Sequence, residues 1–96
     1  MPGARLFVPA VHDVEIADIS QSGVLFWCRN TFQVGQRAQI RALLDREPFT
    51  ASVEIVRQDR AWQVGRTERR QCFGARFVSV DDNSQRNLQR FLVLTR

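Results

Sequence analysis

Short runs in which apolar and polar residues alternate occupy much of the chain, and this period of two is typical of β-strands. Strands with this pattern are predicted over residues 14–18, 24–28, 49–55 and 73–78. The second of these runs is apolar on both of its faces, which indicates a strand that is covered on both sides. Residues 1–13 include two of the three prolines and predict an N-terminal arm or an edge strand.

Residues 36–45 fit two patterns. Leu43 and Leu44 follow Ile40 at the spacing of a helix, whereas Ala42 and Leu44 follow it at the alternating spacing of a strand. The glycine just before this run fits a turn that leads into a strand, so we predict a strand.

Residues 58–71 are polar, and we predict a long connection between two strands there. This connection holds several arginines around Trp62. An exposed tryptophan beside arginines could stack on a base or anchor a protein partner, and it could equally fold over the end of the sheet.

A helix is predicted over residues 82–93, near the C-terminus. Asp81 or Asp82 can accept hydrogen bonds from the free N–H groups of its first turn, and Asp82 with Gln85 matches a capping box. The apolar residues that follow have helical spacing, so one stripe of the helix should lie on the sheet. The residues expected in the core are Val53, Ile55, Phe73 or Phe77, Leu88, Phe91 and Leu92.

Ninety-six residues make one domain, with five or six short strands over residues 14–80 and a helix over residues 81–94. This order favours a mainly β fold, a small antiparallel barrel that the helix closes. No apolar run is long enough to span a membrane, and no secretion signal is visible, so we expect no membrane insertion.

The net charge is +4, yet all fourteen basic residues are arginine. This bias indicates a GC-rich genome and weakens the argument that each arginine binds phosphate. Two distant cysteines do not make a disulfide framework, and we expect them to be reduced in a cytoplasm. One histidine and two cysteines at distant positions do not have the spacing of a metal site.

Residues 18–23 combine Asp18, Ser20 and Gly23 in a D-x-S-x-x-G pattern between two predicted strands. An Asp and a Ser two residues apart in an extended chain point the same way, so their oxygens can converge on one ligand edge. Gly23 permits a positive φ or a close backbone approach. The alternative interpretation is a polar turn, because these residue types favour turns.

In these features the chain resembles the PilZ family of bacterial signalling domains. The resemblance implies a six-stranded antiparallel β-barrel with one C-terminal α-helix, and it favours a strand over residues 36–45. The segments that carry it are Asp18-x-Ser20-x-x-Gly23, Val34-Gly35-Gln36, Phe73-Gly74-Ala75-Arg76-Phe77-Val78 and Leu88-x-x-Phe91-Leu92.

PilZ domains typically bind cyclic di-GMP, and the resemblance implies that Asp18 and Ser20 contact a guanine while Gly23 lets the ligand approach. A carboxylate suits this role because guanine presents two N–H donors on one edge. The family's R-x-x-x-R arm, which clamps the phosphates, is missing upstream of Asp18: either the chain is an excised or shortened domain, or its site is degenerate. The accessory candidates for ligand contact are Arg5, Trp62, Arg66, Arg69 and Arg70.

The sequence does not suggest an enzyme, because no Ser-His-Asp set is visible and His12 stands alone near the N-terminus. We expect a cytoplasmic regulatory domain of cyclic di-GMP signalling, with weak direct binding and neither cofactor nor metal. The alternative is an adaptor that keeps the fold and acts through protein contacts alone. A protein partner or a parent multidomain protein is expected in both cases, and nucleic acid is not.

Overall fold

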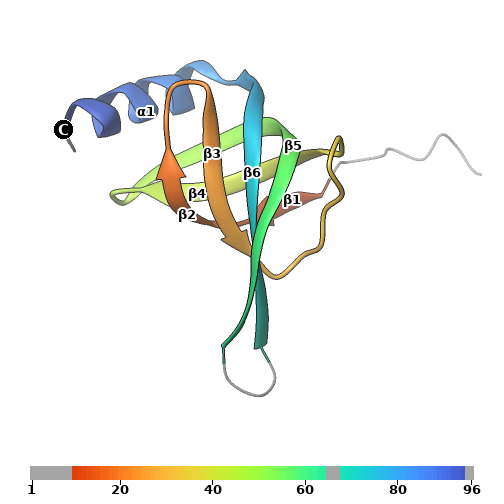
Figure 1. Cartoon of the computed structure of the whole chain (residues 1–96). Coiled ribbons are helices and arrows are strands. Elements are labelled where there is room, and N and C mark those ends of the chain that lie inside the picture. The colour runs from red at the N-terminus through yellow and green to blue at the C-terminus, as the bar shows by residue number, and fades with distance from the viewer. Residues whose placement is uncertain (1–9, 65–67, 95–96) are drawn as a thin grey trace, which may run out of the picture.

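The computed structural model describes residues 10–64 and 68–94, with the backbone alone for residues 60–64 and 68–69. This part of the chain forms six strands and one helix (Figure 1). They are β1 (Val11–Asp13), β2 (Glu15–Ile19), β3 (Gly23–Cys28), β4 (Arg37–Leu44), β5 (Glu47–Val64), β6 (Glu68–Val80) and α1 (Asp82–Leu94).

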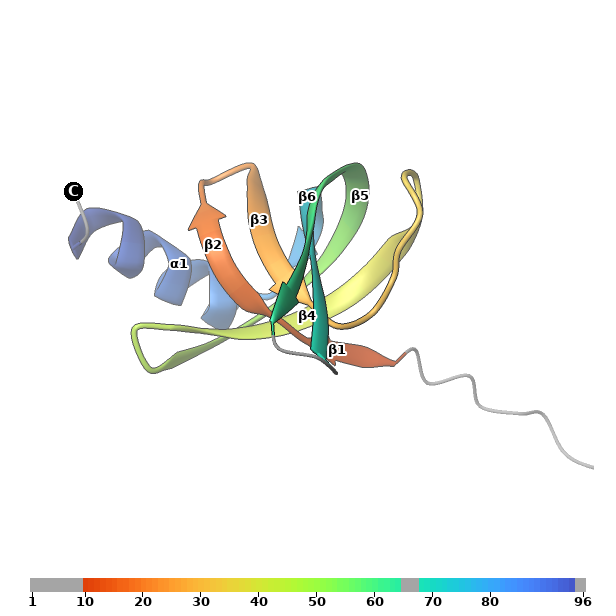
Figure 2. The same cartoon turned by 60° about the horizontal axis from the view of Figure 1, so that its bottom comes forward.

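The strands form one curled sheet in the order β1-β4-β5-β6-β3-β2 (Figures 1 and 2). The sheet is not closed, since β1 and β2 are its two edges, and it is mixed, since β1 runs parallel to β4 with Val11 opposite Gln39. The prediction of a mainly β fold with one C-terminal helix is confirmed. The prediction of a strictly antiparallel barrel is wrong.

Chain direction explains the parallel pair. Only Val14 separates β1 from β2, and its N–H donates to the Arg41 carbonyl at 3.0 Å, so one extended segment serves both edges. From β2 through β3, β6 and β5 to β4, each neighbour reverses direction. Four reversals leave β4 running in the same direction as β2. Because β1 continues into β2, it must be parallel to β4.

The core lies inside the curl of the sheet, where alternate residues of each long strand point inward. Val53, Ile55, Phe73 and Leu88 are fully buried, as predicted. The other side chains predicted there, Phe77, Phe91 and Leu92, are half-buried and pack against the core. The remaining buried apolar residues of the main cluster are Val24, Phe26, Cys28, Phe32, Ile40, Leu44, Phe49, Ala51 and Ala75.

Residues 36–45 follow the strand alternative, since β4 runs from Arg37 to Leu44. A two-residue turn at Asp45 and Arg46 joins β4 to β5, and both residues have positive φ angles of 50° and 73°. Positive φ at both central positions is the signature of a type I′ hairpin, whose twist matches that of the paired strands.

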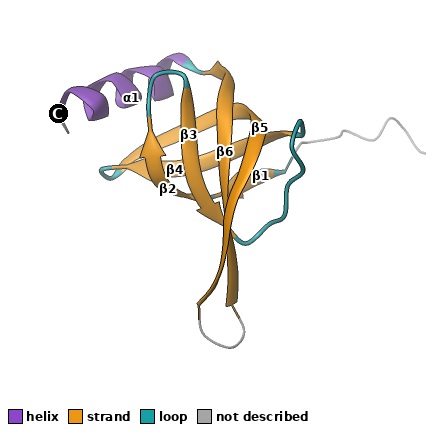
Figure 3. Ribbon diagram, viewed as in Figure 1, coloured by secondary structure: helices purple, strands orange, loops and turns teal. Residues whose placement is uncertain are grey.

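The prediction of a long connection over residues 58–71 is wrong. β5 and β6 continue through most of this stretch as a paired hairpin that projects from the body of the sheet, with Val64 opposite Glu68 (Figures 1 and 3). The backbone ladder continues through a stretch whose sequence is mostly polar. The sustained alternation that reveals a half-buried strand is absent from that stretch.

The helix α1 begins after Asp81, whose Oδ1 accepts the Ser84 backbone N–H at 2.8 Å. Asp81 is thus the cap, and the predicted capping box of Asp82 with Gln85 is not used. The Ser84 hydroxyl in turn accepts the Thr50 N–H at 2.9 Å, which ties the start of the helix to β5. Within the described residues, no helix is long and apolar enough to cross a membrane.

Candidate functional site

The turn between β2 and β3 is organised around Ser20. Its hydroxyl oxygen accepts the backbone N–H groups of Ser22 and Gly23 at 3.3 and 3.2 Å, and the hydroxyl can donate to the Gly23 carbonyl at 3.3 Å. The Ser20 N–H donates to the same carbonyl at 2.9 Å. These bonds are typical of a serine-centred turn, so Ser20 has a structural role in the described chain.

Asp18 faces outward because β2 contains a bulge. The pairing with β3 shifts between Ile16 and Asp18, and two consecutive residues, Ala17 and Asp18, are exposed before Ile19 turns inward again. A regular strand would have turned Asp18 toward the core. Its Oδ1 accepts the Ile19 N–H at 3.0 Å, and it forms no ion pair with another described residue.

Gly23 is required by its neighbours rather than by an unusual φ angle. A Cβ at this position would lie 2.6 Å from the carbonyl oxygen of Ala75 on β6, closer than real Cβ contacts allow. Of the two reasons for a glycine that the sequence left open, the structure supports the close backbone approach. The group that approaches Gly23 is the backbone of β6, its neighbour in the sheet.

The three residues of the pattern meet at a shallow hollow of about 220 Å³ on the outer face of the sheet. Asp18, Ser20 and Gly23 line it from the β2–β3 side, and Arg57 and Gly74 line it from β5 and β6. Ligand pockets that enclose a small molecule are usually larger, roughly 300–1,000 Å³. A ligand here would lie across the face and stay open to solvent on one side.

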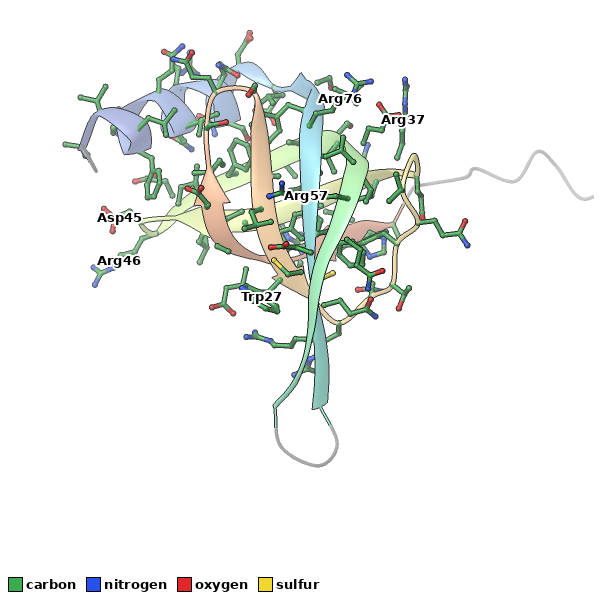
Figure 4. All side chains as sticks on the ribbon, viewed as in Figure 1. Trp27, Arg37, Asp45, Arg46, Arg57 and Arg76 are labelled. Atoms are coloured by element: carbon green, nitrogen blue, oxygen red, sulfur yellow. The ribbon has the colours of Figure 1, made fainter. Side chains whose placement is uncertain are left out.

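Sequence reasoning missed Arg57, which extends from β5 over β6 toward β3 (Figure 4). Gly74 makes this possible, because a Cβ at Gly74 would lie 2.9 Å from both Cγ and Nε of Arg57. The Arg57 side chain therefore lies close against a backbone position that has no side chain. No ion pair joins it to another residue of the described segments. A glycine in an otherwise regular strand was the one available signal for such a close approach.

The accessory candidates from the sequence do not join this hollow where the structure describes them. Arg70 donates to Glu15 at 2.7 Å and lines a different hollow, together with Trp27 and the residues of β1. Arg5 and Arg66 lie outside the described residues. Trp62 and Arg69 are strand residues of the β5–β6 hairpin whose side chains are likewise outside the description.

The described residues contain no group of three His, Cys, Asp or Glu side chains that could hold a metal ion. The Cys28 thiol donates to the Asn30 carbonyl at 3.3 Å, and burial raises its pKa to about 11, so it is protonated at neutral pH. The His12 ring packs at a right angle to the Phe32 ring, with 5.0 Å between the ring centroids. Cys28 and His12 therefore contact neighbouring residues of the fold.

The family model described as the PilZ domain matches residues 3–94, which confirms the resemblance seen in the sequence. No curated protein and no solved structure matches the chain.

Proposed function

Since the chain belongs to the PilZ domain family, we propose that it is a bacterial regulatory domain that binds cyclic di-GMP on the outer face of its sheet. One observation carries the proposal: Asp18, Ser20 and Gly23 line one hollow together with Arg57. The Asp18 carboxylate is exposed and can accept the N1–H and N2–H groups of a guanine. The domain works by binding and relay, in the cytoplasm, and needs no catalytic group or metal.

We expect the affinity of this chain to be weak. Residues 1–17 hold no R-x-x-x-R spacing, so these 96 residues do not themselves supply the paired contacts by which that arm clamps the two phosphates. Each charge-assisted hydrogen bond is worth about 1.5–3 kcal/mol. Since about 1.4 kcal/mol changes a dissociation constant tenfold, the loss of a few such bonds weakens binding by several orders of magnitude.

Substitution of Asp18 tests the proposal. Asp18→Ala should weaken cyclic di-GMP binding at least about tenfold, because guanine loses its charged acceptor. The thermal midpoint should change little, because an exposed carboxylate outside the core contributes little to stability. Titration of the ¹⁵N-labelled chain with cyclic di-GMP, followed by amide chemical shifts, measures millimolar as well as tighter affinities.

The matched control is Asp59→Ala, which removes the same charge from an exposed position of β5 that does not line the hollow. Equal affinities for the Asp18 and Asp59 variants would contradict a guanine contact at Asp18. Sub-micromolar binding by the unaltered chain would contradict the expectation of weak affinity.

A second function, that of an adaptor that acts through protein contacts alone, is favoured by the state of Ser20. A hydroxyl offers one donor and two acceptor positions, and the turn can use all three. Ser20 would then serve only the turn, and signalling would pass to a protein partner or to a parent multidomain protein. In that case the titration shows no binding at millimolar cyclic di-GMP. Nucleic acid is not part of either proposal.

A further inference from the structure

We infer that Arg57 supplies the phosphate contact of this face, so that one guanine nucleotide unit lies between the Arg57 guanidinium and the Asp18 carboxylate. The inference rests on the proposed function, since it takes cyclic di-GMP as the ligand. It names a residue that the D-x-S-x-x-G pattern does not contain and that lies on another strand, 39 positions after Asp18.

The two residues occupy opposite ends of one row across four strands. Asp18 on β2 pairs with Leu25 on β3, Leu25 pairs with Gly74 on β6, and Gly74 pairs with Arg57 on β5. Neighbouring strands lie about 4.8 Å apart, so the row spans about 14 Å between its end Cα atoms. The Arg57 side chain covers part of this span by lying on Gly74, which leaves a gap on the scale of a single nucleotide.

Asp18 and Arg57, at the two ends of the row, both face outward because each strand contains a β-bulge. The pairing of β2 shifts between Ile16 and Asp18, and the pairing of β5 shifts between Ile55 and Arg57. In β5, Val56 and Arg57 are exposed in succession after the buried Ile55. Without these two bulges, strand alternation would direct Asp18 and Arg57 toward the core. Bulges often re-aim a side chain beside a binding site, and here they aim an acid and a base at one hollow.

The charge of Arg57 is available to a ligand. Three other arginines of the sheet are used within the fold: Arg41 bonds Asp13 at 2.8 Å, Arg70 bonds Glu15, and Arg76 bonds Glu54. Arg57 forms no such pair with a residue of the described ranges, although it lines the hollow. A guanidinium that has no ion-pair partner within the described ranges can bind a phosphate through two parallel N–H···O bonds.

The groups along the row follow the same order as their partners in a guanine nucleotide, from the base to the phosphate. The carboxylate accepts from the donor edge of the base, and the half-buried Leu25 offers an apolar surface under its ring. The guanidinium then meets the phosphate at the far end. A ligand that presents only a phosphate, or only a guanine, would use one end of the row.

Arg57→Gln tests the inference, because it removes the charge and keeps most of the length of the side chain. We expect cyclic di-GMP affinity, measured by amide shift titration, to fall between about tenfold and a hundredfold. Affinity for guanosine, which has no phosphate, should not change. The matched control is Arg37→Gln, which removes the same charge from an exposed position of β4 outside the hollow (Figure 4) and should leave both affinities unchanged.

Gly74→Ala gives a second test that leaves Arg57 in the sequence. The added Cβ would displace the flexible Arg57 side chain, so the variant should fold and yet lose cyclic di-GMP affinity much as Arg57→Gln does. If the unaltered chain and Arg57→Gln bind cyclic di-GMP equally well, Arg57 only packs on Gly74 and makes no phosphate contact. The inference then fails, and the proposed function stands. If the unaltered chain shows no binding at millimolar cyclic di-GMP, the proposed ligand is wrong and the role of Arg57 fails with it.

Discussion

At Gly23 two backbones come closer than any side chain permits, because a Cβ there would lie 2.6 Å from the Ala75 carbonyl oxygen. Gly23→Ala should therefore push β3 away from β6 and lower the free energy of unfolding by about 1–3 kcal/mol, as overpacking does. Urea denaturation followed by circular dichroism measures this loss. Ser22→Ala, next to it in the same turn, is the control and should change stability by less than about 0.5 kcal/mol. Equal stability of the two variants would contradict a structural role for Gly23.

The residues of the hollow were only partly predictable from the sequence. Asp18, Ser20 and Gly23 lie close together in the chain, so their spacing placed them near one turn, but the outward position of Asp18 depends on the bulge in β2. Arg57 was not predictable, because its position depends on a bulge in β5 and on its pairing with Gly74. An alternating pattern shows which residues share a face only while the pairing stays regular.

Among the elements, α1 depends on the cap at Asp81. Asp81→Ala leaves the Ser84 N–H without its 2.8 Å acceptor and should lower the free energy of unfolding by about 0.5–2 kcal/mol. Asp82→Ala is the matched control, since it removes a neighbouring charge from the first turn and leaves the cap in place. Thermal melting of both variants at neutral pH gives the comparison, and an equal loss in the two would contradict the cap.

The same cap has a pH dependence with a definite sign. The hydrogen bond from the Ser84 N–H lowers the pKa of Asp81 below its ordinary value of 3.8 in the folded chain. A lowered folded-state pKa means that the stabilisation is complete above pH 3.8 and is lost as the pH falls through the lower, folded value. The stability difference between the unaltered chain and Asp81→Ala should therefore shrink in acid below pH 3.8.

The helix and strands were predictable where one face is buried, because burial of one face gives the apolar residues a regular period in the sequence. The helix and the half-buried strands show their period in the sequence, and residues 36–45 form the strand that alternation favoured. The far part of the β5–β6 hairpin was missed, because its sequence is mostly polar and shows no sustained alternation. The two strands pair through their backbones and through a 2.8 Å hydrogen bond from the Gln58 amide to the Gln71 side chain, and such pairing leaves no period in the sequence.

At the scale of the whole molecule, alternation reveals strands but does not encode their direction or closure. Six strands in sequence suggested alternating directions around a closed barrel. The structure instead uses the continuous segment of β1 and β2 for both edges of the sheet, so β1 must be parallel to β4. The pattern predicted five or six strands and the structure has six, but their arrangement required knowing that a single residue, Val14, joins the first two.

The core is one unit that includes α1, and Leu88 is the residue of the helix that belongs to the fully buried cluster. Leu88 is 0% exposed and belongs to the same cluster as Ile40 and Phe49 of the sheet. Leu88→Ala should lower the free energy of unfolding by about 2–5 kcal/mol, because it removes buried apolar atoms and leaves a cavity. The control is Val93→Ala, which truncates a side chain of the same helix that is 74% exposed and should change stability by less than about 0.5 kcal/mol.

Both substitutions replace a residue with alanine, the best helix former, so neither loses helix propensity, and any gain is at most about 0.7 kcal/mol, small against the expected loss from burial. Denaturation should be followed at two probes, far-ultraviolet circular dichroism and the fluorescence of the tryptophans, one of which lies on β3. If α1 is part of the cooperative core, the two probes give the same lowered midpoint for Leu88→Ala. A helix that unfolds first, or a Leu88 variant as stable as the Val93 variant, would mean that the sheet folds without it.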